Sequence, residues 1–223
     1  TRGIGKAIAE GFGVAGAKIA VASRKADACD AMVAHLTEMG IEAIGVPTHM
    51  GDLDSISNLV DETVAAYGKV DILVNNAGII RRADSIEFSE ADWDAVMDTN
   101  LKVVFFLTQA FAKQALKQGF EAGQAKVINI ASLLSFQGGI RVPSYTASKS
   151  GVAGLTKLLA CEWAAKGVNV NAIAPGYIAT NNTAALQADD GRFARLLRDA
   201  GLAAVAGRRP CVLRARVVRE KRA

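Results

Sequence analysis

Short apolar stretches alternate with longer amphipathic ones along most of the chain. The apolar stretches cover residues 17–23, 41–46, 70–75, 126–131 and 168–174, and each predicts a buried strand. Apolar residues three and four apart predict helices over 4–11, 26–39, 52–67, 89–118 and 144–166. Gly40 and Gly68 follow two of these helices as stop signals.

The order of these elements predicts the fold class. Strands alternate with helices, and the strands are apolar throughout, as in a parallel sheet covered on both faces. We therefore expect an α/β fold with a doubly wound parallel sheet, a Rossmann-type three-layer sandwich. No linker or internal repeat divides residues 1–190, which we interpret as one dinucleotide-binding catalytic domain. Residues 191–223 form an Arg-rich tail with no usable periodicity.

Charge is distributed unevenly along the chain. The net charge is +4, but residues 192–223 hold ten basic residues and two acidic ones, whereas residues 1–191 hold 16 basic and 20 acidic. A shifted reading frame, a gene-model error or a nucleic-acid-binding arm could each give such a tail. The tail lacks interleaved aromatic residues and any nucleic-acid-binding motif, so we predict no nucleic-acid partner.

Composition limits the class of protein further. Hydrophobic residues make up 51% of the 223 residues, enough for the core of one domain of ordinary size. No apolar run reaches the ~20 residues of a membrane span, so we expect no membrane partner. Cys29, Cys161 and Cys211 are odd in number, far apart and without metal-ligand spacing. They indicate a cytoplasmic protein with no metal site.

Tyr145 and Lys149 are the first candidates for chemistry. They are four residues apart within a predicted helix, so both side chains should lie on one face, one turn apart. A nearby cation lowers the pKa of a phenol, which would let Tyr145 exchange a proton near neutral pH. Ser132 follows a predicted strand and could hydrogen-bond a substrate oxygen at the same place. Alone, the Tyr-x-x-x-Lys spacing is weak evidence.

Polar residues and glycines at the strand ends strengthen that interpretation. Ser23-Arg24, residues 75–78, Ser132 and Pro175-Gly176 each follow a predicted strand. Ligands bind outside the carboxyl ends of the strands in such sheets. Residues 1–5 place glycines at a helix start, where backbone N–H groups can contact a phosphate. A full dinucleotide motif would need a strand and another glycine before Thr1.

Taken together, these residues resemble the short-chain dehydrogenase/reductase family over roughly residues 1–183. The matching pieces are residues 1–5, residues 75–78, Asn100, Ser132, Tyr145 with Lys149, and Pro175 with Gly176. Stretches 75–82, 136–145 and 176–183 are similar to a narrower group, the 2-deoxy-D-gluconate 3-dehydrogenases and gluconate 5-dehydrogenases. The resemblance implies hydride transfer between a nicotinamide cofactor and a secondary alcohol or ketone of a sugar acid. A 3-oxoacyl-carrier-protein reductase would share the same catalytic residues.

The resemblance also implies residue roles. Tyr145 would be the acid/base, Lys149 would lower its pKa and hold the cofactor ribose, and Ser132 would polarise the carbonyl. Asn100 would position a proton-relaying water, or alternatively brace a helix bend, and Asn75 would stabilise the sheet. The residues implied to contact the cofactor are Arg2, Gly3, Ile4, Gly5, Ser23, Arg24, Asn76, Ala77, Gly78, Tyr145, Lys149, Pro175, Gly176 and Ile178.

Cofactor and substrate preferences can be predicted from charge. NAD enzymes place a carboxylate ~20 residues after the glycines, but this chain has Ser23-Arg24 there, and Arg2 lies in the glycine turn. A guanidinium binds a phosphate well, which favours NADP, although the sugar-acid resemblance favours NAD. Arg82 or Arg141 could hold a substrate carboxylate beside Ser132 and Tyr145, or both could be surface charges.

The chain departs from the family at both ends. The family's first strand and first glycine would precede Thr1, and its last strand and ending are not recognisable after about residue 190. We therefore expect unpaired strand edges, and a chain that by itself is poorly folded and inactive. A non-catalytic fragment is the second hypothesis. For the full-length form, the resemblance implies a homotetramer.

Overall fold

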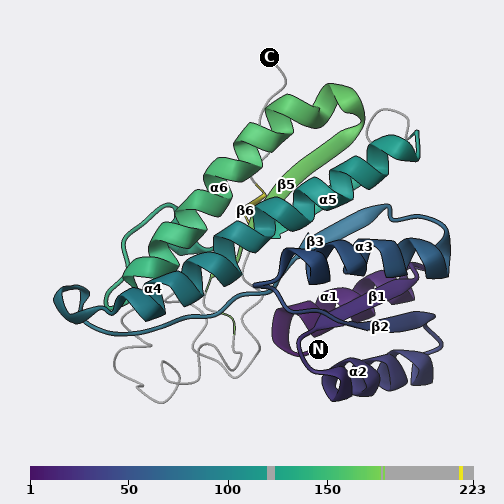
Figure 1. The fold of residues 1–223 in the computed structure, drawn as a ribbon, viewed down its shortest axis with the longest axis horizontal. Coiled ribbons are helices and arrows are strands. Elements are labelled where there is room, and N and C mark those ends of the chain that lie inside the picture. Colours follow the sequence, from purple (N-terminus) through teal and green to yellow (C-terminus); the bar gives the residue numbers. More distant parts are fainter. Residues whose placement is uncertain (120–123, 177, 179–215, 218–223) are drawn as a thin grey trace, which may run out of the picture.

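The computed structural model describes residues 1–119, 124–176 and 178, and the backbone of 216–217. Its longer elements, in chain order, are α1 (Gly3–Val14), β1 (Ile19–Ser23), α2 (Ala26–Glu38), β2 (Ala43–Pro47), α3 (Leu53–Tyr67), β3 (Ile72–Asn75), α4 (Glu90–Met97), α5 (Val103–Lys117), β4 (Ala125–Ile130), α6 (Pro143–Trp163), β5 (Val168–Ala174) and β6 (Arg216–Val217). Each predicted strand and helix through residue 174 is present, with ends shifted by a few residues (Figure 1).

The strands form two sheets. β1 pairs with β2, while β3, β4 and β5 pair in that order, and all of these ladders are parallel. Among the described residues no ladder joins β1 to β3, so these two strands have the unpaired edges that we expected. β6 pairs antiparallel with β5 and lies in the tail, where the sequence predicted no strand. The rest of the tail is outside the described residues.

Among the described residues, helices pack on both faces of β1 and β2 and on one face of β3, β4 and β5. Alternate strand residues face opposite sides: Val21 of β1 packs in a core cluster with α2, whereas Val46 of β2 packs in a cluster with α3 and α5. A third cluster joins β4 and β5 to α5 and α6. One helical layer therefore contains α1 and α2, and the other contains α3, α5 and α6.

The predicted helix over 89–118 is interrupted. Ser89 caps α4 by accepting a hydrogen bond from the Asp92 backbone N–H at 3.2 Å. A π-helical turn at Asp98–Lys102 then separates α4 from α5. Such turns insert one extra residue and occur often at functional sites. Here the turn contains Asn100, whose side chain is fully buried.

A buried polar network fastens the strands to the helices beneath the strand ends. Asn75 of β3 donates to Asn129 of β4 and to Thr108 of α5, at 2.8 Å each. Asn129 in turn donates to Thr156 of α6 at 2.9 Å. Asn75 and Asn129 are register partners in the parallel ladder. The sequence-based expectation that Asn75 stabilises the sheet agrees with these contacts.

Asn129→Ala should lower the free energy of unfolding by about 2–4 kcal/mol, because it removes two hydrogen bonds and leaves buried polar atoms without partners. Denaturant unfolding measures this change. The control is Asn58→Ala, at an exposed position on α3, which should change stability by less than ~0.5 kcal/mol. Equal effects of the two substitutions on the free energy of unfolding would show that the buried network does not stabilise the fold.

Candidate active site

The glycine turn at the start of α1 lies against the end of β3. Gly3 has a positive φ of 57°, which a residue with a side chain rarely adopts. A Cβ atom on Gly5 would lie 2.5 Å from the side-chain nitrogen of Asn76. Only glycine permits this approach. The glycine turn and the segment that begins at Asn76, 71 residues after Gly5, therefore meet at the strand ends, as a parallel sheet predicts.

Asn100 connects this region to α6. Its side chain accepts from the Ile79 N–H at 2.8 Å, donates to the Ile79 carbonyl at 2.9 Å, and donates to Ser148 at 3.3 Å. These contacts join the π-turn to the backbone after β3 and to α6, and they agree with the bracing role that the sequence left open beside the proton-relay role. Gly78 lies beside it, since a Cβ there would be 3.4 Å from the Asn100 oxygen and 3.8 Å from Lys149 Nζ.

Lys149 is a buried cation, with only 4% of its surface exposed. Its Nζ donates to the carbonyl of Ile130 at the end of β4, at 2.5 Å. Burial disfavours the charged form and lowers the pKa of Lys149 from 10.5 to about 8. Lys149 and Tyr145 share one face of α6, as the spacing predicted, with Nζ 5.8 Å from the centre of the tyrosine ring.

The pKa of Tyr145 shifts opposite to the expected direction. Burial of the phenol raises its pKa above 10 and outweighs two lowering influences, a hydrogen bond with Ser132 and the positive charge of Arg82. The prediction that Lys149 lowers this pKa was therefore wrong for this arrangement. The ammonium points to a carbonyl and is itself poorly solvated. The phenol is protonated at neutral pH.

Ser132 lies directly beyond β4, as expected. Its hydroxyl caps a short 3-10 turn by accepting from the Leu134 N–H at 3.2 Å. Ser135, which the sequence analysis did not single out, donates to the Lys149 carbonyl at 2.7 Å and so ties this turn to α6. Ser148 is a second missed residue. It is fully buried between Asn100 and the Tyr145 carbonyl. In the sequence, only its position next to Lys149 could have indicated that it belongs to the site.

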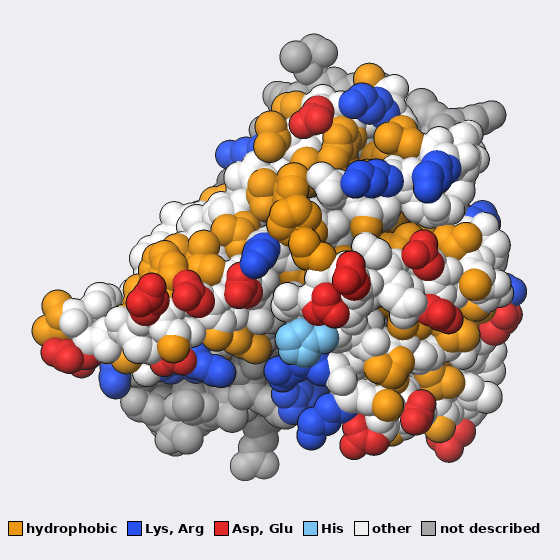
Figure 2. All heavy atoms as spheres, in the orientation of Figure 1, with side chains coloured by type: hydrophobic (Ala, Val, Ile, Leu, Met, Phe, Trp, Pro, Cys, Tyr) orange, Lys and Arg blue, Asp and Glu red, His pale blue; other side chains and the backbone are white. Residues whose placement is uncertain are grey.

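A pocket of about 580 Å³ lies beside the N-terminal end of α1 and the end of β1. It is lined by Thr1, Arg2, Lys6, Ser23, Arg24, Lys25, Ala28, Ala31, Met32 and His35. The three predicted residues Arg2, Ser23 and Arg24 are thus brought together. Four lining residues are cationic and none is Asp or Glu. We call this pocket the basic groove. Figure 2 shows one face of the molecule, on which Lys and Arg side chains gather beside a histidine.

The two candidate carboxylate-binding arginines differ in surroundings. The charge of Arg82 reaches Tyr145 and lowers its pKa. Arg141 is half exposed, and its Nε lies 3.1 Å from a carboxylate oxygen of Asp84. Arg141 also has a positive φ of 64°, an uncommon conformation for a residue with a side chain. Only Arg82 is therefore placed to act on the reacting end of the site.

The remaining predicted residues lie on the same segments. Ile4 is in α1, and Ala77 lies between Asn76 and Gly78. The Pro175 carbonyl accepts from the Leu133 N–H at 3.3 Å, and the Ile178 N–H donates to the Gly176 carbonyl at 3.0 Å, so the segment after β5 lies next to Ser132. Stretch 179–183 of the resemblance is outside the described residues. No group of three possible metal ligands occurs in the described part of the chain.

Comparison with known proteins shows which family this chain belongs to. The family model for short chain dehydrogenases matches residues 1–191, so the chain belongs to the short-chain dehydrogenase family. The fold expected from that family, a Rossmann-type α/β sandwich, is the fold described above.

Individual relatives are similar as well. A 2-dehydro-3-deoxy-D-gluconate 5-dehydrogenase of Escherichia coli is 56% identical over 165 residues, 74% of this chain and 64% of the relative. An Agrobacterium tumefaciens structure with bound NADP, provisionally described as a 2-deoxy-D-gluconate 3-dehydrogenase, is 58% identical. Its TM-score is 0.79, with coverage of 88% of this chain and 76% of that one. A Burkholderia cenocepacia gluconate 5-dehydrogenase with NADP and tartrate is 34% identical, with TM-score 0.83 and the same coverage. The chain thus spans about 64% of the length of the Escherichia coli relative.

The burial of Lys149 makes stability depend on pH. The pKa of Lys149 in the folded protein is about 8, below the ordinary 10.5. Burial of the charged lysine therefore lowers the free energy of unfolding by its full amount below pH 8. Between these two values the unfolded chain binds the proton and the folded protein does not, so stability rises with pH. Relative to Lys149→Met, the wild-type free energy of unfolding should rise by up to ~3 kcal/mol across that interval.

Denaturant unfolding at several pH values measures the difference between the two proteins. Lys157→Met, at an exposed position two turns further along α6, serves as the control and should follow the wild-type pH dependence. Parallel pH profiles for wild type and Lys149→Met would contradict the assigned pKa shift.

Proposed function

We propose that this protein is an NADP-dependent oxidoreductase that interconverts a secondary alcohol and a ketone of a sugar acid of the gluconate or 2-dehydro-3-deoxygluconate type. The observation that carries the proposal is the assembly of Tyr145, Ser132 and Lys149 at the strand ends, beside the Gly78 backbone. The relatives with sugar-acid names and the NADP-bound neighbours support it.

The residues present fit a nicotinamide dinucleotide with a 2′-phosphate. Thr1 and Arg2, at the N-terminal end of α1, line the basic groove, and the groove collects four cations without a carboxylate in its lining. Arg24 and Arg2 would hold the 2′-phosphate, for which a guanidinium is well suited. Asn76, Ala77 and Gly78 would contact the nicotinamide half, and Lys149 would hold its ribose. The cofactor supplies the hydride chemistry.

The protein residues handle the proton. Because the Tyr145 phenol is protonated at neutral pH, it is ready to donate a proton to a ketone oxygen. Ser132 would hydrogen-bond the same oxygen and orient it toward the phenol. In the oxidative direction Tyr145 must accept the proton, and Arg82 and Ser132 favour the phenolate that precedes this step. The site is thus suited to reduction at neutral pH and to oxidation at higher pH.

Arg82 would bind the substrate carboxylate. Its charge already acts on Tyr145, so an acid held by Arg82 would have its hydroxyl-bearing carbons near the phenol. Tartrate in the Burkholderia cenocepacia enzyme is a hydroxy acid of this kind. A carrier-linked 3-oxoacyl substrate would use Tyr145 and Ser132 equally well, but it presents no carboxylate for Arg82.

The proposed protein is a cytoplasmic homotetramer. The three cysteines are odd in number and far apart in the sequence, which supports a protein of the reducing cytoplasm. A homotetramer follows from the family resemblance, and the exposed Leu116 and Leu158 on α5 and α6 are suited to subunit contacts. No helix among the described residues is long and apolar enough to cross a membrane.

Tyr145→Phe in the full-length form tests the proposed chemistry. Removing the hydroxyl should lower kcat to below about a tenth of normal, because general acid–base catalysis contributes roughly 10²–10⁴-fold. NADP affinity, measured by fluorescence titration, should stay within about twofold, since the ring and Lys149 remain in place. Retention of more than about a tenth of normal kcat would remove Tyr145 from the reaction.

Arg82→Ala and Arg141→Ala separate the two carboxylate candidates. We expect Arg82→Ala to raise KM for the sugar acid by about tenfold or more, because it removes a charged hydrogen bond, while Arg141→Ala changes KM by less than about twofold. A related polyol without a carboxylate is the matched substrate, and its KM should not respond to Arg82→Ala. Turnover of carrier-linked ketones alone would instead support the 3-oxoacyl alternative.

A further inference from the structure

The basic groove contains two residues that the sequence motifs did not select. Lys6 extends from α1 and His35 from α2, and both line the groove together with Arg2 and Arg24. No recognised dinucleotide motif includes either position. Lys6 adds an ammonium group to the groove lining, and His35 adds an imidazole ring.

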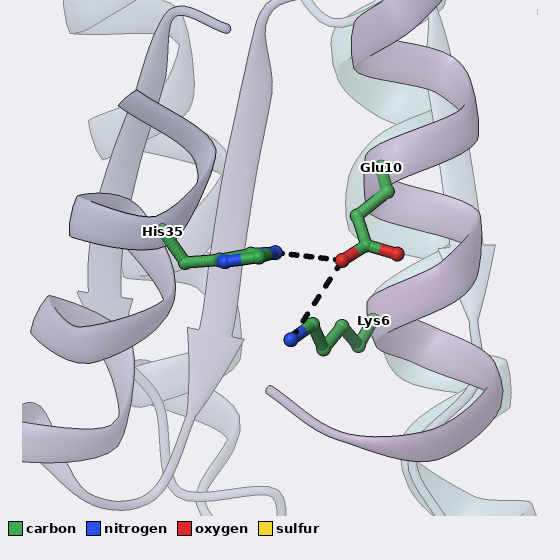
Figure 3. Close-up of polar contacts among 3 residues, drawn as sticks. All are labelled: Lys6, Glu10 and His35. Atoms are coloured by element: carbon green, nitrogen blue, oxygen red, sulfur yellow. Dashed lines mark hydrogen bonds and ion pairs between the residues drawn. The ribbon is translucent and has the colours of Figure 1, made fainter. Parts of the chain in front are cut away.

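A single carboxylate links these two residues. Figure 3 shows Glu10 of α1 between them, and one of its oxygens, Oε1, lies 2.7 Å from His35 Nε2 and 3.7 Å from Lys6 Nζ. The hydrogen bond with His35 is the main cause of the lowered pKa of Glu10. The contact with His35 is short and joins α1 to α2. The contact with Lys6 is long and lies within one helix.

The difference between the two contacts determines which group can move. An exposed i,i+4 pair such as Lys6–Glu10 contributes little to stability, so little holds Lys6 on the carboxylate. If Lys6 left, Glu10 would still have His35 as its partner, and the contact between α1 and α2 would persist. Lys6 can therefore turn into the groove without disrupting the helices that form it.

We propose that Lys6 is a specificity-determining residue for the 2′-phosphate of the cofactor, and that it exchanges Glu10 for this phosphate when the cofactor binds. The inference rests on the proposed function for the identity of the ligand. A phosphate monoester carries up to two negative charges and three acceptor oxygens, whereas Glu10 offers Lys6 part of one charge that it already shares with His35. The dianion is therefore the stronger partner for the Lys6 ammonium.

In this arrangement Glu10 and His35 are positioning residues. Their hydrogen bond connects the second half of α1 to the last turn of α2 and so holds the two helices that border the groove together. Arg2, Arg24 and Lys6 all line the groove, and in the proposed complex each of them contacts the phosphate. Three cations from three segments would then surround one phosphate, and a cofactor without the 2′-phosphate would gain nothing from Lys6.

Binding measurements with two nucleotide fragments test the role of Lys6 without relying on turnover. Adenosine 2′,5′-bisphosphate carries the 2′-phosphate, and adenosine 5′-monophosphate lacks it. We expect Lys6→Gln to weaken binding of the bisphosphate by about five- to tenfold in calorimetric titration, because a partly exposed charged hydrogen bond is lost. Binding of the monophosphate should change by less than about twofold.

Further variants distinguish the proposed contact from general effects of charge or structure. Lys6→Arg should keep the preference for the bisphosphate. Glu10→Gln should retain or strengthen binding of the bisphosphate, because Lys6 then has no competing carboxylate. Lys18→Gln is the matched control. Lys18 is an exposed lysine, paired with Glu42, outside the groove, and this variant should bind both fragments as the wild type does.

Three results would overturn the inference: equal losses for both fragments in Lys6→Gln, a loss no larger than that of Lys18→Gln, or no preference for the bisphosphate in the wild type. The proposed function has its own test in Tyr145→Phe. If turnover depends on Tyr145 but Lys6→Gln keeps the wild-type preference for the bisphosphate, this inference is contradicted and the proposed function is not. Selective fragment binding through Lys6 without any turnover would contradict the proposed function alone.

Discussion

The buried ammonium of Lys149 is the constraint on which the site depends. An unpaired charge removed from water is strongly destabilising, so the surrounding chain must supply an acceptor. Here the acceptor is the Ile130 carbonyl, which is available because β4 ends there and the chain turns into the cap at Ser132. The end of one strand, the start of a 3-10 turn and the second turn of α6 are therefore fixed relative to one another. The same burial lowers the pKa of Lys149 toward neutrality.

A second set of polar contacts holds the opposite wall of the site. The π-turn at Asp98–Lys102 turns the Asn100 amide toward the backbone of Ile79, and this amide also reaches Ser148 on α6. Below it, the hydrogen bonds from Asn75 through Asn129 to Thr156 cross from β3 to α6. Because buried amides must be satisfied, the two networks allow little freedom in how the segment after β3 meets α6. Gly78 thus lies beside Lys149 without a side chain between them.

The two ends of the candidate site use charge differently. At the reacting end, the titratable groups are buried, and exclusion of water raises the pKa of Tyr145 while lowering that of Lys149. At the basic groove, cationic side chains gather without a carboxylate in the lining, which suits them to hold an anion. Arg82 connects the two types of region, since its charge still influences the buried phenol. Proton transfer and anion binding are thereby assigned to separate parts of one surface.

The sequence by itself determined the elements and most members of the site. Apolar stretches, helix caps such as Ser89 and stop signals such as Gly68 act locally, so each strand and helix through residue 174 could be predicted within a few residues. Tyr145 and Lys149 could be placed on one face because helical spacing is local too. Only the tertiary structure decided the pKa directions, the pairing of Arg141 with Asp84 and the Lys6–Glu10–His35 cluster. These depend on which groups exclude water from one another and on distances between segments far apart in the chain, as with the 21 residues that separate Ile79 from Asn100. No local pattern specifies such distances.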